Sequence, residues 1–116
     1  LDQANDGDPV LAVGRQLRHM AALSGSMLRK AVRAADEMDP GLARSVLERD
    51  AELDAEFAAA LRLVMSYVLQ DHRFLRPTID TIFALKGLER IGDHATNIAE
   101  QVLYMMGQDR QQADAA

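Results

Sequence analysis

The sequence predicts an all-α protein, an antiparallel up-down-up three-helix bundle that forms one domain. Its 116 residues include only 3 prolines and 7 glycines, and its commonest residue types are good helix formers. Apolar residues recur at spacings of three and four over three long stretches. Two Asp-Pro pairs indicate helix starts, because aspartate caps a helix and proline suits the first helical position. A chain of this length can bury a single core.

The first predicted helix begins at Asp8-Pro9 and ends near Glu37. Residues 1–8 are polar and rich in turn formers, so we expect a lead-in loop there; the bundle itself should span residues 9–107. The predicted core face consists of apolar and small residues: Val10, Val13, Leu17, Met20, Ala21, Ser24, Met27, Leu28, Ala31 and Ala35.

The second predicted helix follows a tight turn at residues 38–40 and runs from Pro40 to about Gln70. Projected at about 100° per residue, Asp50 and Asp54 fall within the arc of its apolar residues. The glutamates of this helix fall outside that arc: Glu48, Glu52 and Glu56. The apolar residues that define the arc are Leu42, Val46, Leu53, Phe57, Leu61, Val64 and Val68.

The third predicted helix is capped by Asp71 and continues to about Met106, with Pro77 in its first turns or at a kink. Gly107 is a suitable C-cap, and we expect residues 108–116 to form a flexible polar tail. Because the connections are short, neighbouring helices must be antiparallel. The predicted core face is Leu85, Leu88, Gly92, Ala95, Ala99, Val102, Leu103 and Met106.

The amino-acid composition limits the classes of function that are possible. A net charge of −5 gives no support for a protein that binds nucleic-acid phosphates. The absence of cysteine excludes disulfides and thiolate metal sites, so any metal would be bound by oxygen or imidazole. No apolar run approaches the roughly 18 residues of a membrane span. The Glu-x-x-His spacing of di-iron bundles and the glycine-rich phosphate loop are also absent from the sequence.

Two pairs of acidic residues are the most informative feature. Asp50 and Asp54 form the first acidic pair, and Glu89 and Asp93 form the second; each pair lies on one side of its helix. Both pairs lie roughly 25–33 Å from the turn near residue 71, and therefore at one level. Converging carboxylates repel and lose hydration unless a cation neutralises them. Oxygen ligands of this kind suit multivalent cations, and Asn97 and Glu100 could extend the site.

Other interpretations stay open from the residues alone. The acids could be ordinary exposed side chains paired with Arg49, Lys86 and Arg90. His19 could be the phosphate acceptor of a helical dimerisation or histidine-phosphotransfer module of a two-component system, although no acid adjoins it in sequence. A third possibility is a metal-dependent hydrolase or oxidase of the carboxylate-bundle type.

The run Leu88-Glu89-Arg90-Ile91-Gly92-Asp93-His94-Ala95-Thr96-Asn97-Ile98-Ala99-Glu100, followed by Val102-Leu103-Tyr104-Met105, resembles the signature of the PhoU family of phosphate-signalling proteins. Val46-Leu47 with Asp50-Ala51-Glu52-Leu53-Asp54 resembles the family's other acidic motif. The resemblance covers roughly residues 15–108.

This resemblance implies one repeat of a fold that pairs two three-helix bundles in tandem. The chain looks most like the second repeat, so it is either the C-terminal half of a longer protein or a single-repeat member that forms a homodimer. The family binds clusters of iron, zinc or magnesium-type ions. The ligand positions carried over to this chain are Asp50, Asp54, Glu89, Asp93 and Asn97.

The resemblance also implies a function. Family members are regulators rather than enzymes, and they repress phosphate uptake and phosphate-responsive signalling when phosphate is plentiful. The implied partners are the ATPase of a phosphate ABC transporter and a sensor histidine kinase, with no nucleic acid. The expected location is cytoplasmic and at most peripheral to the membrane.

Overall fold

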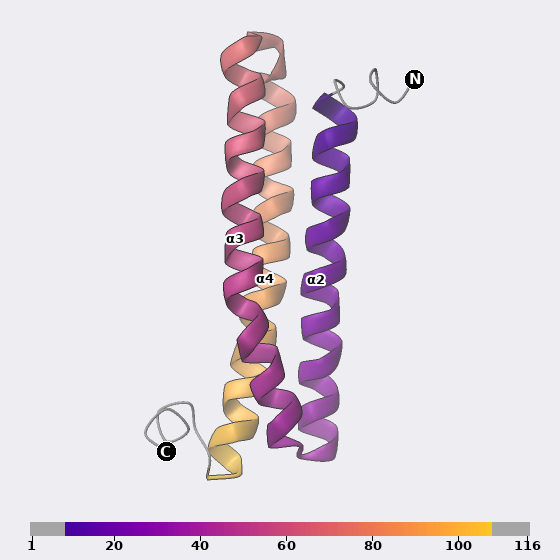
Figure 1. Cartoon of the computed structure of the whole chain (residues 1–116), viewed down its shortest axis with the longest axis vertical. Coiled ribbons are helices and arrows are strands. Elements are labelled where there is room, and N and C mark those ends of the chain that lie inside the picture. The colour runs from indigo at the N-terminus through magenta and orange to yellow at the C-terminus, as the bar shows by residue number, and fades with distance from the viewer. Residues whose placement is uncertain (1–8, 108–116) are drawn as a thin grey trace.

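A computed structural model describes residues 9–107 as a bundle of three long helices with no strand in that range. Figure 1 shows the helices side by side along the long axis of a body of 52 × 25 × 22 Å, and each helix contacts both others. The predicted fold class is therefore confirmed. The expected lead-in loop, the Asp8 cap and the expected flexible tail lie outside the described residues. The elements are α2 (Pro9–Glu37), α3 (Pro40–Gln70), the 3-10 helix η1 (His72–Phe74) and α4 (Leu75–Met105).

One aspartate both ends α2 and begins α3. The N–H of Asp39 donates to the Ala34 carbonyl at 2.9 Å, and its carboxylate accepts from the Leu42 N–H at 3.1 Å. Pro40 then occupies the first helical position, as predicted. Met38 completes the turn with φ 51°, in the left-handed region that costs a residue with a side chain roughly 1–2 kcal/mol.

The second turn corrects one prediction, because Asp71 caps η1 and not α4. Its extended backbone ends α3 by donating an N–H to the Tyr67 carbonyl, and its carboxylate accepts from the Arg73 N–H at 3.0 Å. Hydrogen bonds from the Arg73 side chain and backbone lower the pKa of Asp71 to about 2. Helix α4 begins at Leu75 after this extra turn, without a side-chain cap. Pro77 lies in its first turn, where a missing N–H costs no hydrogen bond.

Small residues let the helices approach closely in the core. Gly92 of α4 is the tightest point, because a Cβ atom there would overlap the Leu53 Cδ2 methyl of α3 and lie 4.0 Å from Met27 Cε of α2. All three helices therefore meet at this level. The buried apolar side chains are Met20, Met27, Ala31, Ala34, Ala43, Val46, Leu47, Leu53, Ala60, Val64, Leu85, Ala95, Ala99, Val102 and Leu103.

The predicted core faces are right at most central positions, but they are wrong near their ends and at Ala21, which is exposed in the middle of α2. Val10 is 72% exposed, and Met106 is also exposed. The start of α2 stops short of the α3–α4 turn (Figure 1), so its first turn has fewer neighbours. The core instead recruits Ala34, Ala43 and Leu47, which lie one position beside the predicted stripes. Alanine is small enough to lie where two helices come closest.

Replacing Gly92 by alanine tests this close approach. Leu53 is buried and has little room to change rotamer, so Gly92→Ala should lower the free energy of unfolding by about 1–3 kcal/mol. Urea denaturation followed by circular dichroism measures the change.

Gly87→Ala is the matched control. Gly87 lies in the same helix, and an added Cβ would meet nothing within 4 Å. That substitution should stabilise the bundle by about 0.5–1 kcal/mol through helix propensity alone. Equal stability gains in both variants would contradict a tight α3–α4 contact.

Candidate metal site between α3 and α4

Two contacts fix the level of the acidic pairs. The Lys86 ammonium of α4 lies 5.1 Å from the centre of the Phe57 ring of α3. The Leu53 side chain lies over Gly92. Both contacts fit an antiparallel register in which the first acidic pair is level with about residues 90–94 of α4. The second acidic pair is therefore within about one helical turn of it, as the distance from the turn predicts.

The first acidic pair lies on the flank of α3 that faces α4. At about 100° per residue, both aspartates fall on the same side of Leu53 as Phe57, whose ring contacts α4. Asp50 is half-buried, whereas Asp54 is exposed. Glu56 falls on the opposite side and contacts α2, where its carboxylate accepts from Gln16 at 2.7 Å and lies 3.2 Å from His19 Nε2. Helix α3 thus directs different acids to its two neighbours.

The second acidic pair lines a shallow hollow on α4. This hollow encloses about 340 Å³ between Phe83, Lys86, Glu89, Arg90 and Asp93. The Glu89 side chain is 23% exposed. Asp93, the other acid of the pair, is exposed, and so is Asn97. The carboxylates of α4 can therefore be reached from solution.

These side chains do not form a preassembled metal centre. Within residues 9–107, no three histidine, cysteine, aspartate or glutamate side chains gather closely enough to bind one ion. Glu89 instead forms an ion pair with Lys86 at 3.3 Å, and Arg49 pairs with Glu52 at 2.6 Å. Carboxylate oxygens fit a hard cation in their chemistry. Binding of a metal ion would nevertheless require the side chains to rearrange, and Lys86 would have to move away from Glu89.

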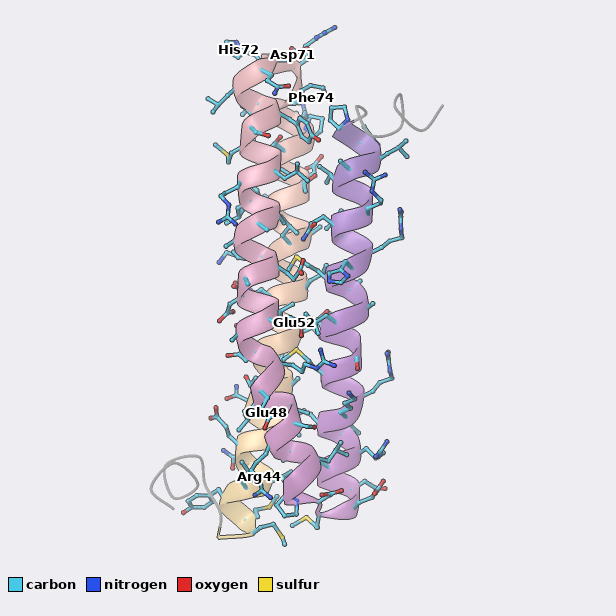
Figure 2. All side chains as sticks on the ribbon, viewed as in Figure 1. Arg44, Glu48, Glu52, Asp71, His72 and Phe74 are labelled. Atoms are coloured by element: carbon cyan, nitrogen blue, oxygen red, sulfur yellow. The ribbon has the colours of Figure 1, made fainter. Side chains whose placement is uncertain are left out.

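Another line of charged residues follows α3. Figure 2 shows Arg44, Glu48 and Glu52 one turn apart along this helix, and all three are exposed. The two glutamates lie outside the apolar arc, as predicted. Glu48 and Glu52 carry the same charge as the first acidic pair and lie on the same helix, so they can serve as a control for it.

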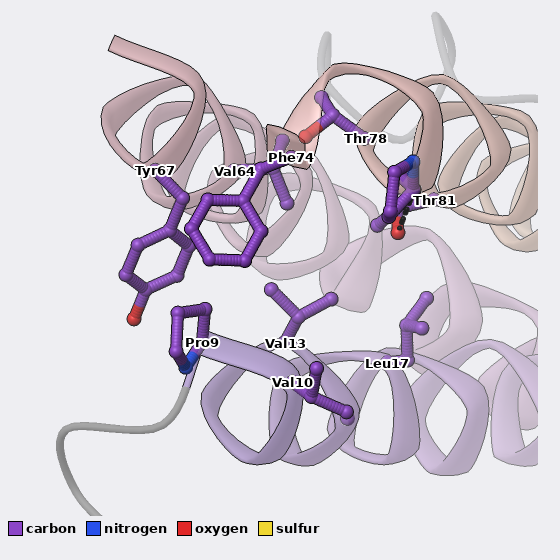
Figure 3. Close-up of a pocket in the computed structure, with 11 residues that line it drawn as sticks. Pro9, Val10, Val13, Leu17, Val64, Tyr67, Phe74, Thr78 and Thr81 are labelled. Carbon is purple, nitrogen blue, oxygen red and sulfur yellow. Dashed lines mark hydrogen bonds between the residues drawn. The ribbon is translucent and has the colours of Figure 1, made fainter. Parts of the chain in front are cut away.

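An apolar groove lies beside the α3–α4 turn. Figure 3 shows it between the start of α2 and that turn, and its volume is about 300 Å³. The rings of Tyr67 and Phe74 lie 6.1 Å apart in its wall. Tyrosine is its only ionisable lining residue, so the groove offers no carboxylate to a cation. Sequence patterns missed it because residues of four elements form it: Pro9, Val10, Val13, Gly14, Leu17, Val64, Tyr67, Phe74, Pro77, Thr78 and Thr81.

The acidic neighbour of His19 comes from another helix. Glu56 reaches it from α3, and the same carboxylate is fixed by Gln16 one turn earlier in α2. A partly buried hydrogen bond of this kind contributes about 0.5–1.5 kcal/mol. The contact therefore ties α2 to α3.

The structure defines the chain as an all-α three-helix bundle with an acid-x-x-x-acid pair on each of two neighbouring helices. The model of the PhoU domain matches residues 17–102. The chain belongs to the PhoU family. The predicted resemblance is therefore confirmed over most of the chain.

Three relatives show the extent of the match. All are named phosphate-specific transport system accessory protein PhoU homologues. The homologue of Xylella fastidiosa (strain Temecula1) is 41% identical over 84% of this chain and 41% of its own length. The homologue of Rhizobium meliloti is 39% identical over 80% of this chain and 39% of its own length. The homologue of Pseudomonas aeruginosa is 40% identical over 78% of this chain and 38% of its own length. No solved structure matches the chain.

These comparisons settle the class of protein. The family is one of accessory proteins and not of enzymes, so the hydrolase and oxidase alternative is not supported. The phosphotransfer alternative gains nothing from them either. The chain spans about two fifths of the length of the relatives it matches. None of the helices described over residues 9–107 is long and apolar enough to cross a membrane.

Proposed function

We propose that this chain is a regulatory bundle that represses phosphate uptake and phosphate-responsive signalling when phosphate is plentiful. The family match over residues 17–102 carries this proposal, together with relatives that are named for the phosphate-specific transport system. The bundle acts in the cytoplasm by contacting the ATPase of a phosphate ABC transporter and a sensor histidine kinase. It is at most peripheral to the membrane.

In this proposal a multivalent cation links α3 to α4. Asp50 and Asp54 would bind it from one helix and Glu89 and Asp93 from the other, with Asn97 as a further oxygen donor. Iron, zinc and magnesium-type ions are the candidates that the family resemblance supplies. The matched level of the two acidic pairs supports the proposal, since ligands on both helices can then reach one ion cluster. A bound cation would fix the surface that α3 and α4 present to a partner.

Removing one carboxylate from each helix tests the cation site. Asp54 and Asp93 are exposed, so Asp54→Asn with Asp93→Asn should leave the fold intact. The double variant should bind divalent or ferric ions about tenfold more weakly or worse, a loss of about 1.4 kcal/mol or more. Elemental analysis after purification and calorimetric titration of the metal-free chain measure the loss.

Glu48→Gln with Glu52→Gln is the control, because it removes the same charge from exposed positions of α3 outside the site. Metal affinity should stay at the wild-type level in this variant. A site-specific role for the acidic pairs would be refuted by equal losses in both double variants.

Deleting the gene in its host tests the regulatory role. A reporter that is normally silent in phosphate-rich medium should then be expressed there, because repression has been lost. The wild-type gene should restore silence, and the Asp54→Asn, Asp93→Asn version should restore it less well. Undiminished repression in the deletion strain would overturn the proposed function.

We further propose that the bundle pairs with a second PhoU-type bundle, either another repeat or another copy as a homodimer. Leu75, Ile79 and Phe83 of α4 recur at intervals of four, and all three are exposed. Side chains at this spacing form one apolar stripe along a helix, which is typical of an interaction surface. The greater length of the relatives leaves room for a second bundle in those proteins.

Disrupting the stripe should prevent pairing. Phe83→Asp replaces the most exposed side chain of the stripe by a charge, so the chain should sediment as a monomer at concentrations at which the wild type self-associates. Tyr104→Asp is the control, since Tyr104 is 70% exposed on the same helix but lies far from the stripe, while Phe83 is 74% exposed. If both variants self-associated as the wild type does, this face of α4 could not be the pairing surface.

A further inference from the structure

We propose that Lys86 is a built-in counter-ion that competes with a metal ion for Glu89 and so determines whether the site between α3 and α4 is filled. This inference rests on the proposed cation site and adds a residue that regulates it. The Lys86 ammonium lies 3.3 Å from Oε1 of Glu89, which is one of the candidate ligands.

Lys86 is held by contacts to both helices. Its ammonium forms the ion pair with Glu89, one turn along α4, and lies 5.1 Å from the centre of the Phe57 ring of α3. The negative face of an aromatic ring attracts a cation at this distance. Lys86 thus already links the two flanks that a metal ion would link, in the hollow that also contains Asp93 and Arg90.

The exposures of the two partners differ in a way that fits a displaceable counter-ion. The Glu89 side chain is only 23% exposed, so its carboxylate has lost much of its hydration and gains from a cationic partner. The Lys86 side chain is 60% exposed. A lysine of this kind can swing into water on its flexible stem without disturbing the core. Lys86 can therefore move away from the ion pair into solvent, whereas the Glu89 carboxylate stays at the site.

Metal binding and the ion pair exclude each other for electrostatic reasons. A multivalent cation on Glu89 would lie within a few ångströms of the ammonium, and two positive charges at such distances repel strongly in a partly dry site. The lysine must leave before the ion binds, so part of the binding free energy is spent on releasing it. The same ion pair neutralises Glu89 when metal is absent.

Neutralising Lys86 tests the competition. Calorimetric titration of the metal-free 116-residue chain with Mn²⁺, a hard cation with carboxylate preference, should give about tenfold tighter binding for Lys86→Gln than for wild type. Lys86→Arg retains the charge and should bind like wild type. Arg90→Gln, which removes a charge from the same hollow, should change the affinity by less than about threefold.

Thermal unfolding gives a second readout. Without metal, Lys86→Gln should be slightly less stable than wild type, because Glu89 has lost its partner. Saturating Mn²⁺ should raise its midpoint more than that of wild type. Equal Mn²⁺ affinities for wild type, Lys86→Gln and Arg90→Gln would overturn the role of Lys86 and leave the cation site standing. Absence of Mn²⁺ binding in all chains would overturn the cation site and this inference together.

Discussion

The close approach of α3 and α4 at Gly92 is the constraint on which the rest of the structure depends. A glycine there lets the Leu53 side chain occupy the space that a Cβ would fill, and Met27 of α2 closes the same level from the third helix. Because packed cores tolerate little sliding, this contact fixes the register of the two helices. The register in turn places the first acidic pair beside the second. A packing contact in the core therefore decides the geometry of a polar surface.

Two partly buried glutamates near that contact each have a partner within the bundle. Glu56 faces α2 and is held by Gln16 and His19, so it serves the fold. Glu89 is paired with Lys86, whose side chain is 60% exposed. An acid that is paired by its own chain does not need a metal for folding.

The bundle presents distinct surfaces at its middle and near the end that carries the α3–α4 turn. The acidic flanks lie at mid-height, and the stripe of Leu75, Ile79 and Phe83 lies toward the α3–α4 turn. The apolar groove opens on the α2 side of that turn (Figure 3). The stripe of the proposed pairing and the hollow of the proposed metal site share Phe83, so the two surfaces adjoin on α4.

The sequence by itself determined the three long helices, their order, the first tight turn and the family. It did so because Asp39-Pro40 acts locally and because the apolar periodicity of each helix extends over many turns. It also predicted the level of the acidic pairs, since antiparallel helices joined by a short turn have fixed heights. The pairs of Lys86 with Glu89 and of Arg49 with Glu52 are spaced i, i+3 on one helix, so the sequence could indicate them. Tertiary structure alone decided the contacts between helices. The Lys86 contact with Phe57 and the Glu56 contact with His19 join residues of different helices, and no spacing along one helix encodes the rotation that brings them together. The extra turn η1 was missed for a related reason, because Asp71 can cap either kind of helix and only the path of the chain selects one.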